Sequence, residues 1–147
     1  MPQTRPLLDS ATQLKDAGLV AASAQTQVGG ADAKLDFGAG KPFTEVKLMI
    51  DISAIEVASG DEKYEIEFQL SDSATFASGN VVADVTKVGD SSVTGSSADT
   101  AAGGPIVKTV NNEWQGTRYR YARLFTRIAG TVAMGINYTA YATQRGN

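Results

Sequence analysis

The chain has 147 residues, a formal net charge of −3, and neither histidine nor cysteine. Its length suits one domain with a hydrophobic core of its own. The composition excludes disulfide bonds, thiolate metal sites and histidine-based acid–base chemistry. We therefore expect no enzyme, and we assign no catalytic residue, no metal site and no cofactor. A membrane partner and a secretory signal are not expected either, because long apolar runs are missing.

Residues 1–30 are expected to form an N-terminal arm that is extended or partly helical. A short helix would begin at Asp9 or Ser10 and stop at Gly18. An extended arm that orders against a neighbouring subunit fits the scarcity of bulky apolar side chains equally well. Leu7 and Leu8 are the candidate contact residues of this arm.

Alternation of apolar and polar residues predicts strands throughout residues 31–147. The clearest alternation is YEIEFQL at 64–70, whose glutamates and glutamine are expected on a solvated face. Other strands are expected at 34–38, 45–52, 81–88, 105–110 and 131–142. Residues 89–104, rich in glycine and serine, are expected to form a long mobile surface loop. Short strands at this spacing indicate an all-β, antiparallel sandwich or barrel.

Four of the six arginines lie in RYRYARLFTRI, residues 118–128. Residues 1–113 hold all 16 acidic residues and 8 basic ones, a net of −8, whereas residues 114–147 hold no acid and five arginines, a net of +5. On a regular strand, Arg118 and Arg120 would share one face and Arg123 and Arg127 the other. Neither face would be wholly apolar. Either a bulge near Ala122 switches the faces, or both faces are covered and the arginines are paired.

Three roles are open for these arginines. They could stack on single-stranded nucleic acid with the neighbouring aromatic residues, pair with acids of the same subunit, or contact another protein. The negative net charge of the chain argues against a nucleic-acid partner. Arg118 and Arg120 are expected to face outward.

Three segments together resemble the capsid cement, or decoration, proteins of tailed bacteriophages that have a jelly-roll fold. They are DSATQLKDAGLVAASA (9–24), IDISAIEVASGDEKYEIEFQLSDSATF (50–76) and NNEWQGTRYRYARLFTRIAGTVAMGINYTAYA (111–142). The resemblance implies an antiparallel jelly-roll β-sandwich over residues 31–147. It also implies a structural virion protein on the outer surface of the capsid, which bridges neighbouring subunits of the major capsid protein and self-associates as a dimer or trimer.

The candidate interface residues are then Leu7, Leu8, Trp114, Arg118, Arg120, Arg123 and Arg127. The alternative from another functional class is a jelly-roll carbohydrate-binding module. Such modules stack sugar rings on exposed aromatic side chains, and Trp114, the single tryptophan, is the candidate for that role.

Overall fold

The computed structural model describes residues 12–89 and 105–146. Within them the chain forms strands and no helix. The strands are β1 (Thr12–Lys15), β2 (Leu19–Val20), β3 (Ala24–Gln25), β4 (Gln27–Val28), β5 (Ala31–Asp32), β6 (Leu35–Asp36), β7 (Thr44–Ile55), β8 (Lys63–Ser71), β9 (Val81–Gly89), β10 (Ile106–Asn111), β11 (Glu113–Trp114), β12 (Thr117–Arg118), β13 (Tyr121–Ala129) and β14 (Ile136–Gly146).

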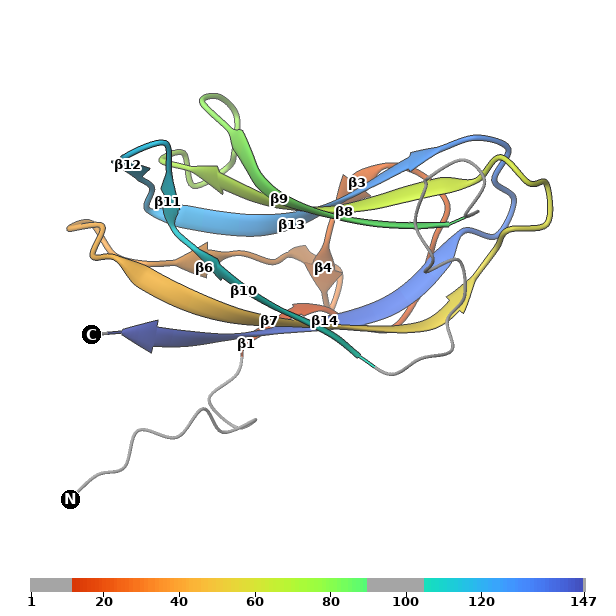
Figure 1. The fold of residues 1–147 in the computed structure, drawn as a ribbon, viewed down its shortest axis with the longest axis horizontal. Coiled ribbons are helices and arrows are strands. Elements are labelled where there is room, and N and C mark those ends of the chain that lie inside the picture. Colours follow the sequence, from red (N-terminus) through yellow and green to blue (C-terminus); the bar gives the residue numbers. More distant parts are fainter. Residues whose placement is uncertain (1–11, 90–104, 147) are drawn as a thin grey trace, which may run out of the picture.

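Two antiparallel sheets of five strands lie face to face (Figure 1). One sheet has the order β1–β14–β7–β10, with β2 also paired to β14. The other has the order β3–β13–β8–β9, with β6 also paired to β13. The pairs β4–β5 and β11–β12 form two small hairpins. The predicted all-β, antiparallel fold is confirmed.

The core lies between the two sheets and follows the alternation of the long strands. Side chains at every second position of β7, β8, β13 and β14 are almost fully buried. The largest of them are Leu48, Ile50, Tyr64, Ile66, Phe68, Leu70, Leu124, Ile136 and Tyr138. Each such side chain contributes roughly 1.5 to 3 kcal/mol by leaving water. The hydroxyls of Thr126 on β13 and Tyr138 on β14 share a hydrogen bond of 2.5 Å across this core.

For residues 12–28 the structure contradicts the helical alternative of the expected N-terminal arm and shows an extended chain. A strand occupies Thr12–Lys15, where a helix was one alternative, and it pairs with β14. Leu14 is fully buried in the core. The following short strands also pair within the same chain, β2 with β14, β3 with β13 and β4 with β5. Leu7 and Leu8 lie outside the described residues. So does the expected loop from residue 90 to 104, whereas Gly89 ends β9.

Lys15 fixes β1 to the sheet. Its side chain is only 4% exposed and its Nζ donates to the backbone oxygens of Tyr138 at 2.9 Å and of Asp16 and Gly18 at 3.0 Å each. The ammonium also lies 4.7 Å from the centre of the Tyr138 ring. Burial lowers the pKa of Lys15, an effect that the negative charge of Asp16 partly opposes.

The predicted strand at 131–142 begins only at Ile136. The residues before it form a turn that ends at Gly135, whose φ is +89°. A Cβ atom on this glycine would lie 1.9 Å from the carbonyl oxygen of Val20. Only glycine allows this backbone conformation and this approach together, so the strand cannot extend into the turn.

Candidate protein-contact surfaces

The arginine-rich run is divided between two elements. Arg118 belongs to β12, which pairs with β11, and β13 begins at Tyr121. From Tyr121 to Ala129, β13 pairs with β8 without a shift in register, so the first of the two alternatives, a bulge near Ala122, is wrong. The break between β12 and β13 is fixed by Asn112, whose side-chain amide donates to the backbone oxygen of Tyr119 at 3.1 Å.

Within β13, one face is buried and the other carries the arginines. Ala122, Leu124 and Thr126 point into the core and are 0 to 1% exposed. Arg123 and Arg127 lie on the opposite, outer face of the sheet, with the aromatic side chains of the same strand. The even-numbered arginines precede this strand, which explains why no regular strand could accommodate the whole run.

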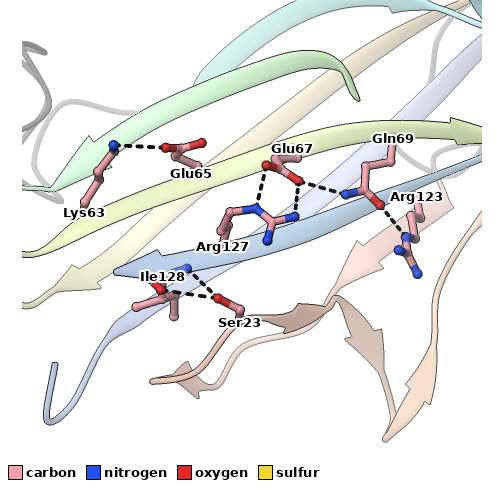
Figure 2. A network of polar contacts seen from close by, with 8 residues as sticks. All are labelled: Ser23, Lys63, Glu65, Glu67, Gln69, Arg123, Arg127 and Ile128. Atoms are coloured by element: carbon pink, nitrogen blue, oxygen red, sulfur yellow. Dashed lines mark hydrogen bonds and ion pairs between the residues drawn. The ribbon is translucent and has the colours of Figure 1, made fainter. Parts of the chain in front are cut away.

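Figure 2 shows a chain of polar contacts on this outer face. Arg127 binds Glu67 through two hydrogen bonds, Nε to Oε2 at 2.9 Å and Nη2 to Oε1 at 3.1 Å. Gln69 Nε2 donates to Glu67 Oε1 at 2.8 Å. Arg123 donates to Gln69 Oε1 at 2.7 Å and to Gln25 Oε1 at 2.6 Å. The network therefore joins β3, β13 and β8.

The expectation of a solvated face is wrong for Glu67 and Gln69, which are each only 5% exposed. Burial by itself would raise the pKa of Glu67. The hydrogen bonds from Arg127 and Gln69, with the positive charges of Arg127 and Arg123, outweigh that effect and hold the pKa below its usual value. Glu67 is thus an ionised group that the neighbouring side chains cover.

Aromatic rings complete this outer face. The Arg123 guanidinium lies 4.5 Å from the centre of the Phe76 ring and 5.2 Å from that of Phe125. The guanidinium of Arg127 lies 4.9 Å from the Phe125 ring. Such cation–π contacts stabilise both the cation and the ring position. Burial lowers the pKa of Arg123, while Asp32 and Glu67 oppose the shift.

Arg120 lies where the chain enters β13, and it is paired too. Its Nε and Nη2 donate to the two carboxylate oxygens of Asp36 at 2.9 and 3.1 Å. The hydrogen bond from Arg120 and that from the backbone of Gly38 lower the pKa of Asp36 to about 2. We call Arg120, Arg123 and Arg127 the arginine face. Arg120 and Arg127 pair with acids of the same subunit, as one of the three sequence interpretations predicted, whereas Arg123 donates to two glutamines.

Arg118 instead belongs to a protruding hairpin. The two residues between β11 and β12, Gln115 and Gly116, both have positive φ angles, 48° and 81°. These values fit the tight two-residue turn of a β-hairpin. Trp114 is 36% exposed, and the half-exposed Arg118 side chain lies 5.7 Å from the centre of the Phe43 ring. We call Phe43, Trp114 and Arg118 the hairpin surface.

A third surface, which sequence reasoning missed, lies at the other end of the sandwich. A hollow of about 360 Å³ has apolar walls formed by Leu19, Ala54, Ile55, Val57, Ala58 and Met134. Leu19 is 53% exposed and Met134 is 62% exposed. The alternation in residues 131–142 predicts Met134 on the apolar side of a strand, so the sequence does not indicate that Met134 is exposed. We call this feature the apolar hollow.

Glu56 holds one wall of the apolar hollow in place. Its carboxylate accepts hydrogen bonds from the backbone N–H groups of Ala133, Met134 and Gly135. Its own N–H donates to the oxygen of Gly135 at 3.0 Å. These bonds, led by those from Gly135 and Met134, lower the pKa of Glu56. The loop that presents Met134 is therefore bonded to the end of β7.

No protein-family profile matches the chain, and no curated protein sequence is similar to it. Residues 12–89 and 105–146 hold no group of three or more acidic side chains placed to bind a metal ion. In the same residues, no helix is long and apolar enough to cross a membrane. The function has to be inferred from the surfaces described above.

Proposed function

We propose that this protein is a structural component of a bacteriophage capsid. It binds the outside of the assembled shell and bridges neighbouring subunits of the major capsid protein. The observation that carries the proposal is the placement of two unlike contact surfaces at opposite ends of one stiff sandwich. A protein that joins other subunits needs such separate contacts more than it needs a reactive site.

Strand β7 connects the two ends. Its first residue, Thr44, lies beside the hairpin surface, where its N–H donates to Asn112 Oδ1 at 2.9 Å. Its last residue, Ile55, lines the apolar hollow. Twelve residues of strand span about 36 Å at 3.3 Å per residue. The two ends of β7 lie at opposite ends of the sandwich (Figure 1), so the two surfaces are far enough apart to touch different neighbours.

Hydrogen bonds between the two sheets also suit a protein that has to resist mechanical force. Lys108 on β10 donates to Asp84 at 2.6 Å and to Thr86 Oγ1 at 2.9 Å, both on β9. These contacts join the two sheets along one edge. The hydrogen bond between Thr126 and Tyr138 joins them in the core. Tension applied at the ends would thus be shared by both sheets.

The strand order supports the jelly-roll part of the proposal. A jelly roll contains eight strands in two packed sheets of four. Here β1–β14–β7–β10 faces β3–β13–β8–β9. The chain changes sheet between β2 and β3, between β6 and β7, between β7 and β8, between β9 and β10, between β10 and β13, and between β13 and β14. Eight principal strands arranged in this way are those expected of a jelly roll, and the shorter strands extend the edges.

We assign the contact with the shell to the hairpin surface. Tryptophan and arginine are the residues that most often dominate the energy of protein interfaces, and Trp114 and Arg118 lie on the two strands of the same short hairpin. The arginine face is less suited to this role, because each of its arginines already donates two hydrogen bonds to side chains of the same subunit. We assign the arginine face the role of stiffening the sheet that contains β13.

The carbohydrate-binding alternative requires a platform of aromatic side chains. Among the large hydrophobic side chains that the structure describes as exposed, Trp114 is the single aromatic one. The nearby Phe43 ring has the Arg118 guanidinium over it. This arrangement favours a protein contact, and a glycan-array screen that found a specific ligand would support the carbohydrate alternative instead.

Binding to shells tests the proposal. The purified protein is mixed with shells assembled from the major capsid protein of the same genome, and bound protein is measured after sedimentation. We expect Trp114→Ala to lower occupancy by about tenfold or more, as for a central interface residue. Val107→Ser is the matched control, because Val107 is 55% exposed on β10 and belongs to neither contact surface. Unchanged occupancy for Trp114→Ala would contradict the assignment.

A further inference from the structure

Two features of the apolar hollow indicate that another molecule binds there: the exposure of its apolar side chains and their position side by side. Leu19 and Met134 are more exposed than most large apolar side chains of a folded domain, and both line the same hollow. Exposed apolar residues that cluster, unlike single ones, mark places where another molecule binds. The position of the hollow at the end of the sandwich leaves it accessible to an extended segment.

The walls of the hollow are fixed before anything binds. The Glu56 carboxylate accepts hydrogen bonds from the backbone N–H groups of Ala133 and Gly135. Gly135 also packs directly against the carbonyl of Val20, next to Leu19. The hollow therefore cannot close by a small shift of the loop. A preformed site of this kind loses little conformational entropy when it binds its partner.

The chain itself contains a segment of matching chemistry. Residues 6–8 are Pro-Leu-Leu, and Leu7 and Leu8 are the one pair of adjacent leucines in the sequence. Residues 1–8 also carry Arg5 and no acidic residue, whereas Glu56 gives the hollow a negative wall. The segment thus offers apolar side chains for the hollow and a positive charge for its rim.

This segment cannot reach the hollow of its own subunit. Thr12 pairs with Ala142, and Gly135 lies seven residues earlier along β14 and its preceding turn, about 23 Å away at 3.3 Å per residue. Leu8 lies four residues before Thr12, a reach of at most about 14 Å. Because β1 and β14 are antiparallel, Thr12 also lies at the end of β1 that is farther from Gly135. The occupant must therefore come from another copy.

We propose that residues 5–8 of one subunit bind in the apolar hollow of a second subunit, with Leu7 and Leu8 against Leu19, Ile55 and Met134. A reciprocal exchange between two copies gives a closed dimer. The dimer then carries two hairpin surfaces. This inference is separate from the proposed capsid function, because it concerns the isolated protein.

The absence of cysteine from the chain makes a direct test available. Leu8→Cys is placed in one preparation and Met134→Cys in another, in which the chain carries a mass tag, and the two are mixed under mild oxidation. We expect the tagged-to-untagged disulfide dimer to form about tenfold faster or more than in the matched control mixture, because binding raises the local concentration of the two thiols. The control replaces Met134→Cys with Val107→Cys, at a residue of similar exposure, 55% against 62%.

Two results would overturn the inference. One is an equal rate of crosslinking to position 107 and to position 134. The other is a disulfide within one chain when Leu8→Cys and Met134→Cys are combined and the protein is diluted. As a second measurement, the full chain is expected to sediment as an oligomer that the double substitution Leu7→Ser and Leu8→Ser converts to a monomer. A wild-type chain that is monomeric at high concentration would also refute the proposal. Shells are not needed, so failure here would leave the capsid proposal standing.

Discussion

At the scale of single residues, charged side chains stabilise this fold where they are covered by others. Glu67 and Lys15 are both almost fully buried, and both have several hydrogen-bond partners. In the described residues, every buried side-chain nitrogen or oxygen atom has a hydrogen-bond partner. Breaking one such contact leaves a buried polar group unsatisfied, which costs more than the bond contributed.

Arg127→Ala should destabilise the protein by about 1 to 3 kcal/mol, because it leaves the Glu67 carboxylate buried without its cation. The upper limit is lower than for a fully buried pair, since the Arg127 side chain is 51% exposed. Chemical denaturation at pH 7 measures the change. Arg118→Ala is the control, because Arg118 and Glu113 are 4.0 Å apart and exposed, and it should cost less than about 1 kcal/mol. Equal effects of the two substitutions would contradict this account of Glu67.

The same pair predicts a dependence on pH. The folded state holds the pKa of Glu67 below its usual value, so the folded protein binds the proton less readily than the unfolded chain. The stabilisation is fully present above the unfolded pKa, about 4.3, and is lost as the pH falls through the folded pKa. The difference in stability between wild type and Arg127→Ala should therefore shrink below about pH 4. A difference that grew with acidity would contradict the sign of this shift.

Lys15→Met should cost about 2 to 4 kcal/mol, because three backbone oxygens lose their donor while the length of the side chain is kept. Lys34→Met is the matched control. Lys34 is exposed and its Nζ donates to the oxygen of Ala74, so its replacement should change stability by about 0.5 kcal/mol or less. Thermal unfolding of the two variants distinguishes the roles. A Lys15→Met protein as stable as wild type would show that β1 is held by its apolar contacts alone.

At the scale of elements, alternation predicted the long strands and β6 but missed the short strands before residue 30. Strands β7, β8, β9 and β10 coincide with their predicted ranges within a few residues, because each has one face in the core. Residues 12–28 form strands of two to four residues, too short to show a period. Strands β1, β2 and β3 are held by pairing with β13 and β14, which no local pattern reveals. The arginine run was likewise divided by contacts of Asn112 with distant residues.

The turn before β14 gives a prediction at this scale. Gly135→Ala should destabilise the protein by about 2 to 5 kcal/mol, from backbone strain and from the clash with the Val20 oxygen. Gly116→Ala is the control, because Gly116 also has a positive φ of +81° but its Cβ would meet nothing within 4 Å. The control should cost about 1 kcal/mol from backbone strain alone. Similar losses of unfolding free energy in both variants would show that the close approach at Gly135 contributes nothing.

At the scale of the whole molecule, the proposed function is that of a connector. The hairpin surface lies at one end of β7, and the apolar hollow lies at the other. If the hollow receives the segment of a second copy, each dimer presents two hairpin surfaces to the shell. Weak contacts repeated over a symmetric lattice then add up through multivalency. The protein would stabilise a shell by position and stiffness, without any chemical step.

The central claim is that the protein stabilises an assembled capsid, and the heat resistance of shells tests it most directly. Shells of the major capsid protein are prepared with the wild-type protein, with Trp114→Ala, and without either. The fraction of intact shells is then followed during heating. The account predicts that complete shells withstand higher temperatures than bare ones, and that shells prepared with Trp114→Ala behave like bare shells. Bare shells as heat-resistant as complete ones would contradict the proposed function.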